Sequence, residues 1–443
     1  MRYPPQDEQL SPADASNVEI DAPDQVNSIM LVGLLGCAGF VSVDGAADLD
    51  RLRAVLAERF RADPGLRRFS QRVAEERRHL VWRACEPDMG WHVRQTEPVA
   101  GRPGLAAVCA RLVTSPLPHD RPLWELLIVP GAGAPPSTAP GIVLRVHHAV
   151  ADGVAGVHLV QRLFDNPPPA GAERAEAPAD QPEPPAPTRR AEPRRGSIRA
   201  RIRGISRIIG IFRRNVAPTI LLGPISQRHG VVLAEVGLDE LRCGARAGSG
   251  TLNDALLAAA VEAVDATLRA MGEPVPEVLP ATVPVALPDR DGSGNAVGVM
   301  IVPLPTGIDD PAARISQISA VTKVAKPDAR SRGTFEMTRS RWATRLFGAL
   351  ARHQRLVAFF VTNVRGPADP LSLAGAPLEA AWPLTPIQGN VRLGVSAFSY
   401  AGRLACTAHL DAAALDQDLF ERALEAELDR IVALGQGPGP TPG

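Results

Sequence analysis

The sequence is poor in cysteine, and the few cysteines follow no metal-binding or disulfide pattern. There are five, an odd number, at positions 37, 85, 109, 243 and 406, and no two of them form a C-x-x-C pair. Disulfide-rich proteins and structural zinc sites need cysteines at close, regular spacings. The sequence therefore disfavours a disulfide framework and a structural zinc site, and it favours a reducing compartment.

Long hydrophobic runs are also missing. The first residues, M-R-Y-P-P-Q-D-E-Q-L-S-P, are polar and lack the apolar core of a signal peptide. The most apolar stretch that follows, Met30 to Val41, contains three glycines and is shorter than the roughly 20 residues of a membrane span. We therefore expect a cytoplasmic protein, either free or held at the inner face of a membrane or on a lipid droplet.

Neither sign of charge is in excess. The 443 residues include 48 basic and 48 acidic side chains, so net charge gives no reason to expect nucleic acid as a partner. Hydrophobic residues make up 45% and charged residues 22%, which indicates a globular protein. A chain of this length suits two domains of about 200 residues each.

Proline and arginine divide the chain into three parts. Residues 165–193 contain nine prolines, which is typical of an extended linker. The next segment is rich in arginine and has apolar side chains at helical spacing, namely Ile198, Ile202, Ile205, Ile209 and Phe212. It is compatible with a helix that lies in a lipid interface and with a helix that packs on the second domain. We predict an N-terminal domain over 1–165, this linker and basic amphipathic segment over 166–215, and a C-terminal domain over 216–443.

Hydrophobic periodicity predicts helices and strands in both halves, and hence the α/β class. In the first half we expect a helix over 46–62 and strands over 29–43, 123–129 and 141–146. In the second half we expect helices over 251–268, 311–323, 336–357 and 416–434, strands over 279–286, 297–304 and 356–363, and a hairpin over 391–410.

One cluster carries the chemistry: R-V-H-H-A-V-A-D-G at 145–153. A predicted buried strand ends in His147 and His148, and Asp152 and Gly153 follow in a turn before a helix. Neighbouring residues of a strand point to opposite faces, so one imidazole can face a cleft while the other anchors the backbone. A neutral imidazole near pH 7 is suited to accept a proton from a hydroxyl group. We expect Asp152 to fix the loop and Gly153 to permit the turn.

Two other interpretations of this cluster are weaker. As a metal site it lacks the i, i+4 histidine pair of helical zinc sites, and no cysteine or glutamate joins it. As an incidental pair of histidines it requires a coincidence of about one in a thousand. The other histidines are isolated in the sequence, and we expect surface or core positions for His79, His92, His119, His158, His229, His353 and His409.

The H-H-x-x-x-D-G pattern resembles the signature of the chloramphenicol-acetyltransferase-like superfamily of CoA- and carrier-dependent acyltransferases. Further blocks resemble those of the bacterial wax ester synthase/diacylglycerol acyltransferase family, in the same order and along nearly the whole chain. They are L-S-P-A-D at 10–14, P-L-W-E at 122–125, N-D at 253–254, G-N at 294–295, V-P-L-P at 302–305, T-N-V-R-G-P at 362–367 and S-Y-A-G at 399–402. The ordered set is more specific than the H-H motif, although Arg365 stands where the family commonly has proline.

The resemblance implies two chloramphenicol-acetyltransferase-like domains with mixed sheets, and an active-site tunnel between them. It implies transfer of an acyl group from long-chain acyl-CoA to the hydroxyl of diacylglycerol or of a long-chain alcohol, without cofactor or metal. By the family's pattern His148 is the general base, His147 and Asp152 support it, and Gly153 shapes the turn beside the substrate. No nucleophilic serine is needed, and the sequence contains no G-x-S-x-G elbow.

The same resemblance supplies substrate-binding candidates outside the motif. Pro122, Leu123 and Trp124 would shape the tunnel wall, although a tryptophan here equally suits a hydrophobic core. Asn253 and Asp254 would contact substrate, although this pair is also typical of a helix cap.

Two other functions stay open on the sequence alone. One is a related acyltransferase that takes its acyl group from a carrier-protein thioester and makes a complex lipid or natural product. The other is a catalytically weak protein that binds lipid surfaces through residues 198–214.

Overall fold

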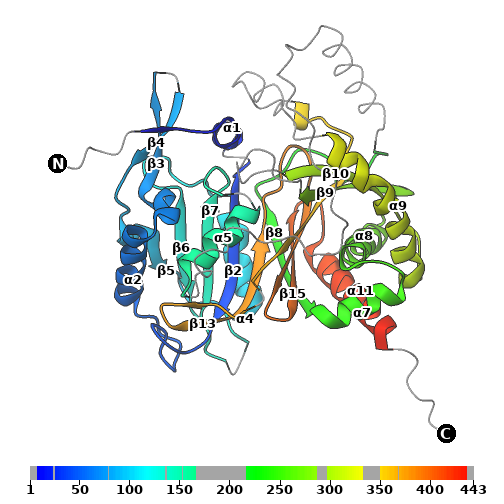
Figure 1. The fold of residues 1–443 in the computed structure, drawn as a ribbon. Coiled ribbons are helices and arrows are strands. Elements are labelled where there is room, and N and C mark those ends of the chain that lie inside the picture. The colour runs from blue at the N-terminus through cyan, green and yellow to red at the C-terminus, as the bar shows by residue number, and fades with distance from the viewer. Residues whose placement is uncertain are drawn as a thin grey trace, which may run out of the picture.

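The computed structural model describes residues 7–22, 25–77, 79–134, 137–151, 153–165, 216–286, 297–332, 350–367 and 369–436 (Figure 1). The predicted linker, its basic amphipathic segment and Asp152 lie outside these residues. Among the described helices, none combines the length and the apolar character that crossing a bilayer requires.

The N-terminal half is built on a six-stranded mixed sheet. Its strand order is β12 (Ser372–Leu373), β13 (Ala376–Leu384), β2 (Ser28–Leu35), β7 (Gly141–His147), β6 (Trp124–Val129) and β5 (Val93–Gln95). The described helices of this half are α1 (Pro12–Ile20), α2 (Leu49–Ala62), α3 (Met89–His92), α4 (Gly101–Leu112) and α5 (Gly153–Leu163), with a 3-10 helix over Pro64–Ser70. A smaller sheet joins β1 (Glu8–Gln9), β4 (His79–Ala84) and β3 (Gln71–Glu76).

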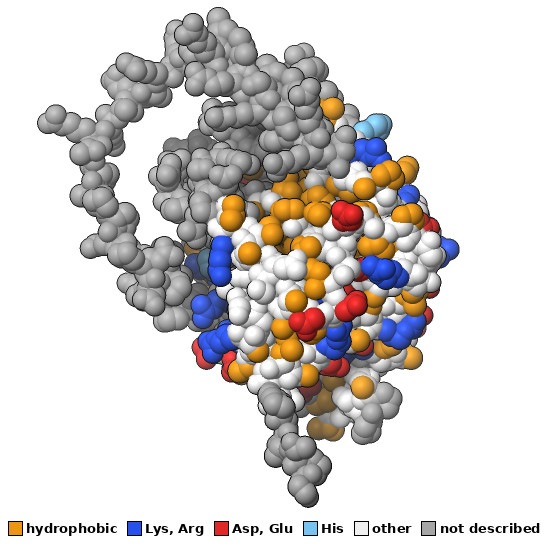
Figure 2. Space-filling view, turned by 90° about the vertical axis from the view of Figure 1, so that its right-hand side faces the viewer, with side chains coloured by type: hydrophobic (Ala, Val, Ile, Leu, Met, Phe, Trp, Pro, Cys, Tyr) orange, Lys and Arg blue, Asp and Glu red, His pale blue; other side chains and the backbone are white. Residues whose placement is uncertain are grey.

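The C-terminal half is built on a second six-stranded mixed sheet. Its strand order is β10 (Val297–Pro305), β9 (Val278–Ala286), β11 (Phe359–Arg365), β14 (Leu393–Tyr400), β15 (Arg403–Asp411) and β8 (His229–Gly237). Its described long helices are α7 (Leu238–Ala247), α8 (Leu252–Ala270), α9 (Pro311–Arg332) and α11 (Gln417–Gln436). They lie on the side of this sheet that faces away from the N-terminal half (Figure 1). The surface seen from that side mixes hydrophobic and charged side chains (Figure 2).

Two strands from late in the sequence complete the first sheet. β13 pairs antiparallel with β2, with Trp382 opposite Val32 and Ala381 opposite Gly33. The strands approach so closely that a β-carbon on Gly33 would lie 2.7 Å from the carbonyl oxygen of Ala380. Residues 372–384 therefore belong structurally to the N-terminal sheet, although the predicted division of the chain assigns them to the C-terminal domain.

The two halves share a hydrophobic core. One buried cluster joins Met30 and Val32 of β2 to Val231 and Leu233 of β8. In the same region the indole nitrogen of Trp382 donates a hydrogen bond to the carbonyl oxygen of Ala234 at 3.0 Å. Because apolar packing and a buried hydrogen bond both cross the boundary, the two sheets are held against each other.

Most predicted elements occur with shifted ends. The helix expected over 46–62 is α2, which begins at Leu49 because the carboxylate of Asp48 caps it. The expected hairpin is β14 and β15, joined by two residues with positive φ, Ala401 and Gly402. The strand expected over 29–43 ends at Leu35, and the helix expected over 311–323 continues to the end of α9. Most of the helix expected over 336–357 lies outside the described residues.

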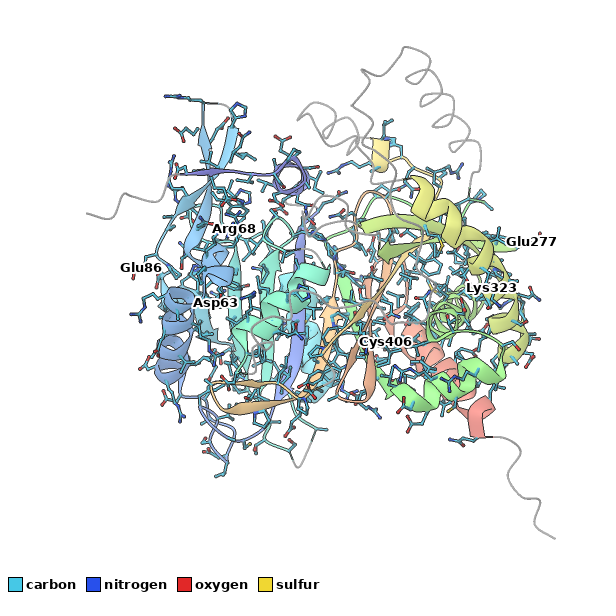
Figure 3. All side chains as sticks on the ribbon, viewed as in Figure 1. Asp63, Arg68, Glu86, Glu277, Lys323 and Cys406 are labelled. Carbon is cyan, nitrogen blue, oxygen red and sulfur yellow. The ribbon has the colours of Figure 1, made fainter. Side chains whose placement is uncertain are left out.

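All five cysteines are free. Cys109 and Cys406 are buried, and Figure 3 shows Cys406 within the sheet of the C-terminal half. Burial raises the pKa of both thiols to about 12, which keeps them protonated and unreactive.

Candidate active site

Strand pairing brings the two most informative sequence blocks together. β6 begins within the P-L-W-E block and runs antiparallel to β7, with Trp124 opposite Val146. The carbonyl oxygen of Leu123 accepts a hydrogen bond from the backbone N–H of His147 at 3.0 Å. The P-L-W-E block therefore supports the end of β7, from which His148 follows.

A buried ion pair lies beside the motif. Nη2 of Arg145 lies 2.6 Å from Oε1 of Glu125, and the second carboxylate oxygen pairs with Arg94. Arg145 also donates to the carbonyl oxygens of Leu112, at 2.7 Å, and Ser115. Its side chain is 4% exposed and that of Glu125 is 0% exposed, so water screens their attraction poorly. The pair therefore fastens β6 to β7 next to the two histidines.

His147 is an internal anchor. Its side chain is fully buried, and Nδ1 accepts a hydrogen bond from the backbone N–H of Ala149 at 3.0 Å. The neutral ring therefore carries its proton on Nε2, which lies 3.5 Å from Oδ2 of Asp21. Burial alone would raise the pKa of Asp21, but its contacts with His119 and His147 hold that pKa well below its ordinary value. A carboxylate from the loop after α1 thus faces the first histidine of the motif.

Asp21, His119 and His147 form a cluster with the composition of a metal site. Their ligand atoms lie within 4.8 Å of one another. A metal ion on Nε2 of His147 would move the ring proton to Nδ1, because metal-bound histidines donate through their other nitrogen. Nδ1 already faces the N–H of Ala149, so the ring is arranged to donate to Asp21 instead. The geometry therefore favours a cluster of polar contacts, in which Nε2 of each histidine lies 3.5 to 3.6 Å from Oδ2 of Asp21, over a metal site.

His148 lies in the turn that follows β7 and is half-buried. Its backbone N–H donates to the carbonyl oxygen of Asn27 at 2.9 Å, and its carbonyl oxygen accepts from Nδ2 of Asn17 at 3.4 Å. The two motif histidines thus have different environments: the ring of His147 is enclosed, whereas His148 is partly accessible. Gly153 is the first residue of α5.

The described contacts of Trp124 are those of a core residue. It is 1% exposed, its indole donates to the carbonyl oxygen of Phe69 at 3.0 Å, and it stacks on His92 with 4.3 Å between ring centroids. Burial lowers the pKa of His92 to about 4, so this ring is neutral. Pro122 and Leu123 are buried beside it. A place for this block in a tunnel wall stays a prediction.

Asn253 and Asp254 lie in the first turn of α8. Thr251 and Asp254 form a capping box, in which Oδ2 of Asp254 accepts from the backbone N–H and from the hydroxyl of Thr251, both at 2.8 Å. The other carboxylate oxygen accepts from the hydroxyl of Thr322 at 2.7 Å. Asp254 therefore caps the helix, and a substrate contact by Asn253 or Asp254 stays a prediction.

Family models match most of the chain. The wax ester synthase/diacylglycerol acyltransferase catalytic domain matches residues 10–256, and the C-terminal domain of the same family matches residues 293–432. The chain belongs to the wax ester synthase/diacylglycerol acyltransferase family. It is an acyltransferase of this type, as its short sequence blocks predicted.

Similar proteins agree with the family and the fold. A Mycobacterium tuberculosis protein named as a diacylglycerol O-acyltransferase is 27% identical over 450 residues, covering 90% of this chain and 84% of its own. The solved wax ester synthase/diacylglycerol acyltransferase of Marinobacter aquaeolei is 20% identical, with a TM-score of 0.69, and covers 97% of this chain and 100% of its own. The starter condensation domain of rhizomide synthetase, solved with C8-CoA, is 14% identical, with a TM-score of 0.54 over 97% of this chain and 94% of its own. The predicted chloramphenicol-acetyltransferase-like α/β fold is confirmed.

The acyltransferase also contains a histidine pair that the sequence did not reveal. Nδ1 of His229 lies 2.7 Å from Nε2 of His409, on neighbouring strands of the C-terminal sheet. Burial lowers the pKa of His409 to about 3. Both histidines line a small hollow together with residues of the N-terminal half, including Gln25 and Val26. His148 is not among its lining residues, so the active-site tunnel stays a prediction.

Proposed function

We propose that this acyltransferase moves a long-chain acyl group from acyl-CoA to the hydroxyl of diacylglycerol or of a long-chain alcohol, with His148 as the general base. The observation that carries the proposal is the contrast between the two motif histidines. The ring of His147 is enclosed and holds Ala149 and Asp21, so it has no access to a substrate. His148 follows directly after the same strand and is half-buried, and we propose that a substrate hydroxyl reaches its ring.

In the proposed reaction His148 accepts the hydroxyl proton while the hydroxyl oxygen attacks the carbonyl carbon of the thioester. A C–O ester bond forms, the C–S bond breaks, and the imidazolium returns the proton to the departing CoA thiolate. The products are triacylglycerol or a wax ester, and free CoA, and the balance needs no cofactor or metal ion. General-base catalysis contributes roughly 10² to 10⁴ in rate, and alignment of the two substrates contributes more.

The relatives support this choice of substrates. The mycobacterial relative is named for diacylglycerol and the Marinobacter enzyme for both wax esters and diacylglycerol. The rhizomide condensation domain, which has the same fold, was solved in complex with C8-CoA. Because such acceptors partition into lipid, we propose a cytoplasmic enzyme that works at a membrane or lipid-droplet surface.

Release of CoA tests the proposal directly. Purified protein is incubated with palmitoyl-CoA and either dioleoylglycerol or hexadecanol, and the free thiol is measured. We expect acceptor-dependent release, and a rate lower by about 10³-fold in His148→Ala. His79→Ala is the matched control, because this exposed histidine lies on β4, and its rate should stay within about twofold of wild type.

Two outcomes would contradict the proposal. A His148→Ala protein that releases CoA at the wild-type rate would rule out His148 as the base. Activity with an acyl-carrier thioester but none with acyl-CoA, in a side-by-side assay, would replace the proposed acyl donor.

A further inference from the structure

The peptide of His148 is held by groups that lie outside the motif. Its N–H donates to the carbonyl oxygen of Asn27 at 2.9 Å, and its carbonyl oxygen accepts from Nδ2 of Asn17 at 3.4 Å. His148 comes directly after the last residue of β7, His147, which is opposite Ser28 in the sheet. After the end of β7, Asn27 and Asn17 make the hydrogen bonds to the backbone of His148 that neighbouring strands make within the sheet.

Asn27 is fully buried, and its polar groups bond in four directions. Its backbone N–H donates to Oδ1 of Asp21 at 2.7 Å, while its carbonyl oxygen holds His148. Its side-chain Nδ2 donates to the carbonyl oxygen of Asn17 at 3.0 Å, and its Oδ1 accepts from Nε2 of Gln388 at 2.8 Å. The amide of Asn27 donates and accepts at once, whereas a carboxylate lacks the donor and an aliphatic side chain lacks both groups.

Gln388 belongs to the C-terminal half of the sequence, so its bond to Asn27 joins distant parts of the chain. Gly389, the residue after Gln388, forms two hydrogen bonds with Gln25. Nε2 of Gln25 donates to the carbonyl oxygen of Gly389 at 2.8 Å, and the N–H of Gly389 donates to Oε1 of Gln25 at 3.3 Å. Gly389 has a φ of +68°, and a β-carbon there would lie 2.7 Å from the carbonyl oxygen of Ala351. We call Gln25, Asn27, Gln388 and Gly389 the clasp.

We propose that Asn27 is a positioning residue for the acyl transfer, and that Gln388 acts on His148 through Asn27. The inference rests on the proposed role of His148 as the base. A general base must lie within hydrogen-bonding reach of the proton that it removes, and a displacement of about 1 Å lowers the rate about 10²-fold. Through the clasp, the base takes its working position only when the C-terminal segment is docked against the N-terminal half.

A double-mutant cycle tests whether Gln388 acts on His148 through Asn27. We expect kcat to fall about 30- to 100-fold in Asn27→Ala, with the KM for acyl-CoA within about threefold of wild type. In Gln388→Ala we expect a fall of about 3- to 10-fold. The double variant should be no more than about twofold slower than Asn27→Ala, because the clasp is already broken at Asn27. Multiplied effects in the double variant would overturn the role of Gln388.

A nearby amide provides the matched control. Asn390 is buried two residues beyond Gln388, but its side chain bonds Gln354, at 2.9 Å from each of its polar atoms, and not Asn27. Asn390→Ala should lose stability and keep kcat within about twofold of wild type. If Asn27→Ala does not fold, Gln388→Ala still decides the matter, because Gln388 is only half-buried.

A second measurement does not depend on turnover. In protein labelled isotopically at histidine Cε1, the His148 signal is identified by its loss in His148→Ala. We expect this signal to shift in Asn27→Ala and Gln388→Ala and to stay in place in Asn390→Ala. If His148→Ala is inactive while Asn27→Ala changes neither kcat nor the signal, the positioning role is wrong and the proposed function stands. If His148→Ala is fully active, the proposed function fails, whatever Asn27 does.

Discussion

Each half of the molecule buries an arginine, but the two arginines lie in different layers. In the N-terminal half Arg145 is on β7 and pairs with Glu125 on the adjacent β6. In the C-terminal half Arg314 is on α9 and pairs with Glu262 on α8 and with Glu427 on α11. Charge is therefore buried within the sheet in one half and among the helices in the other.

This difference indicates that the two buried arginines have different roles, one near the motif histidines and one in helix packing. Arg145 of the sheet pair lies two residues before His147, so a change in strand geometry there would displace the two motif histidines. The helix cluster joins three helices on the outer side of the C-terminal sheet, where it supports packing (Figure 1). A substitution in the Arg145–Glu125 pair should lower both stability and kcat, whereas a substitution in the Arg314 cluster should lower stability alone.

The largest expected effect comes from removing one carboxylate charge in each half. Glu125→Gln leaves Arg145 buried opposite a neutral amide, and we expect the free energy of unfolding to fall by about 3 to 5 kcal/mol. Glu427→Gln should lower it less, by about 2 to 3 kcal/mol, because Glu262 still faces Arg314 and because burial raises the pKa of Glu427 to about 7, so part of its charge is already lost near neutral pH. Urea unfolding measures both values.

The kcat of each variant, measured per folded molecule, then distinguishes the two halves further. We expect kcat to fall about tenfold or more in Glu125→Gln and to stay within about twofold of wild type in Glu427→Gln. Equal losses of kcat in the two variants would contradict the separate roles of the sheet pair and the helix cluster.

Acid should weaken both halves through one enclosed histidine each. Burial lowers the pKa of His92 to about 4 and that of His409 to about 3, whereas a histidine in the unfolded chain titrates near 6.5. As pH falls below about 6.5, the unfolded state binds protons that the native state refuses, so stability is lost. Between about pH 7 and about pH 5.5 we expect a loss of about 1 kcal/mol for each histidine.

Urea unfolding at several pH values checks this loss in the wild type, in His92→Phe and in His409→Leu. Each variant should flatten the dependence of stability on pH by a similar amount. A slope that stays unchanged in one variant would mean that its histidine titrates normally in the native state of that half.

The last comparison concerns helix caps, which we expect to affect stability alone. Asp48→Ala removes the exposed cap of α2 and should lower the free energy of unfolding by about 1 kcal/mol. Asp254→Ala removes the buried capping box of α8 and should lower it by about 2 kcal/mol. Neither variant should change kcat or KM, which steady-state kinetics checks. A raised KM in Asp254→Ala would instead support the substrate role that the N-D block suggested.

Features that are local in sequence were predictable. His147 and His148 stand together at the end of an apolar run, and the cap of α2 and the Ala401–Gly402 hairpin turn have short-range signals. The family blocks extended the prediction to the family, which the family models confirm, and to the fold, which the solved Marinobacter structure confirms.

Features that depend on distant strand pairing were not predictable. Asn27 and Asp21 become neighbours of the motif because β2 pairs with β7, and His229 meets His409 because β8 pairs with β15. β13 has a plausible strand pattern, but no residue within it specifies β2 as the partner. A single sequence shows the hydrophobic periodicity of each strand, whereas these contacts depend on which strands pair in the sheet.

The late return of β13 to β2 has a consequence for how cells make this enzyme. A ribosome completes β2 early and β13 near the end of translation, so one edge of the nascent N-terminal sheet lacks its neighbour for most of synthesis. Exposed strand edges recruit other strands, which is the usual beginning of aggregation. We therefore expect a fragment that ends at the linker to expose this strand edge and to aggregate, and we expect the first half of the polypeptide to complete its sheet only after β13 has emerged.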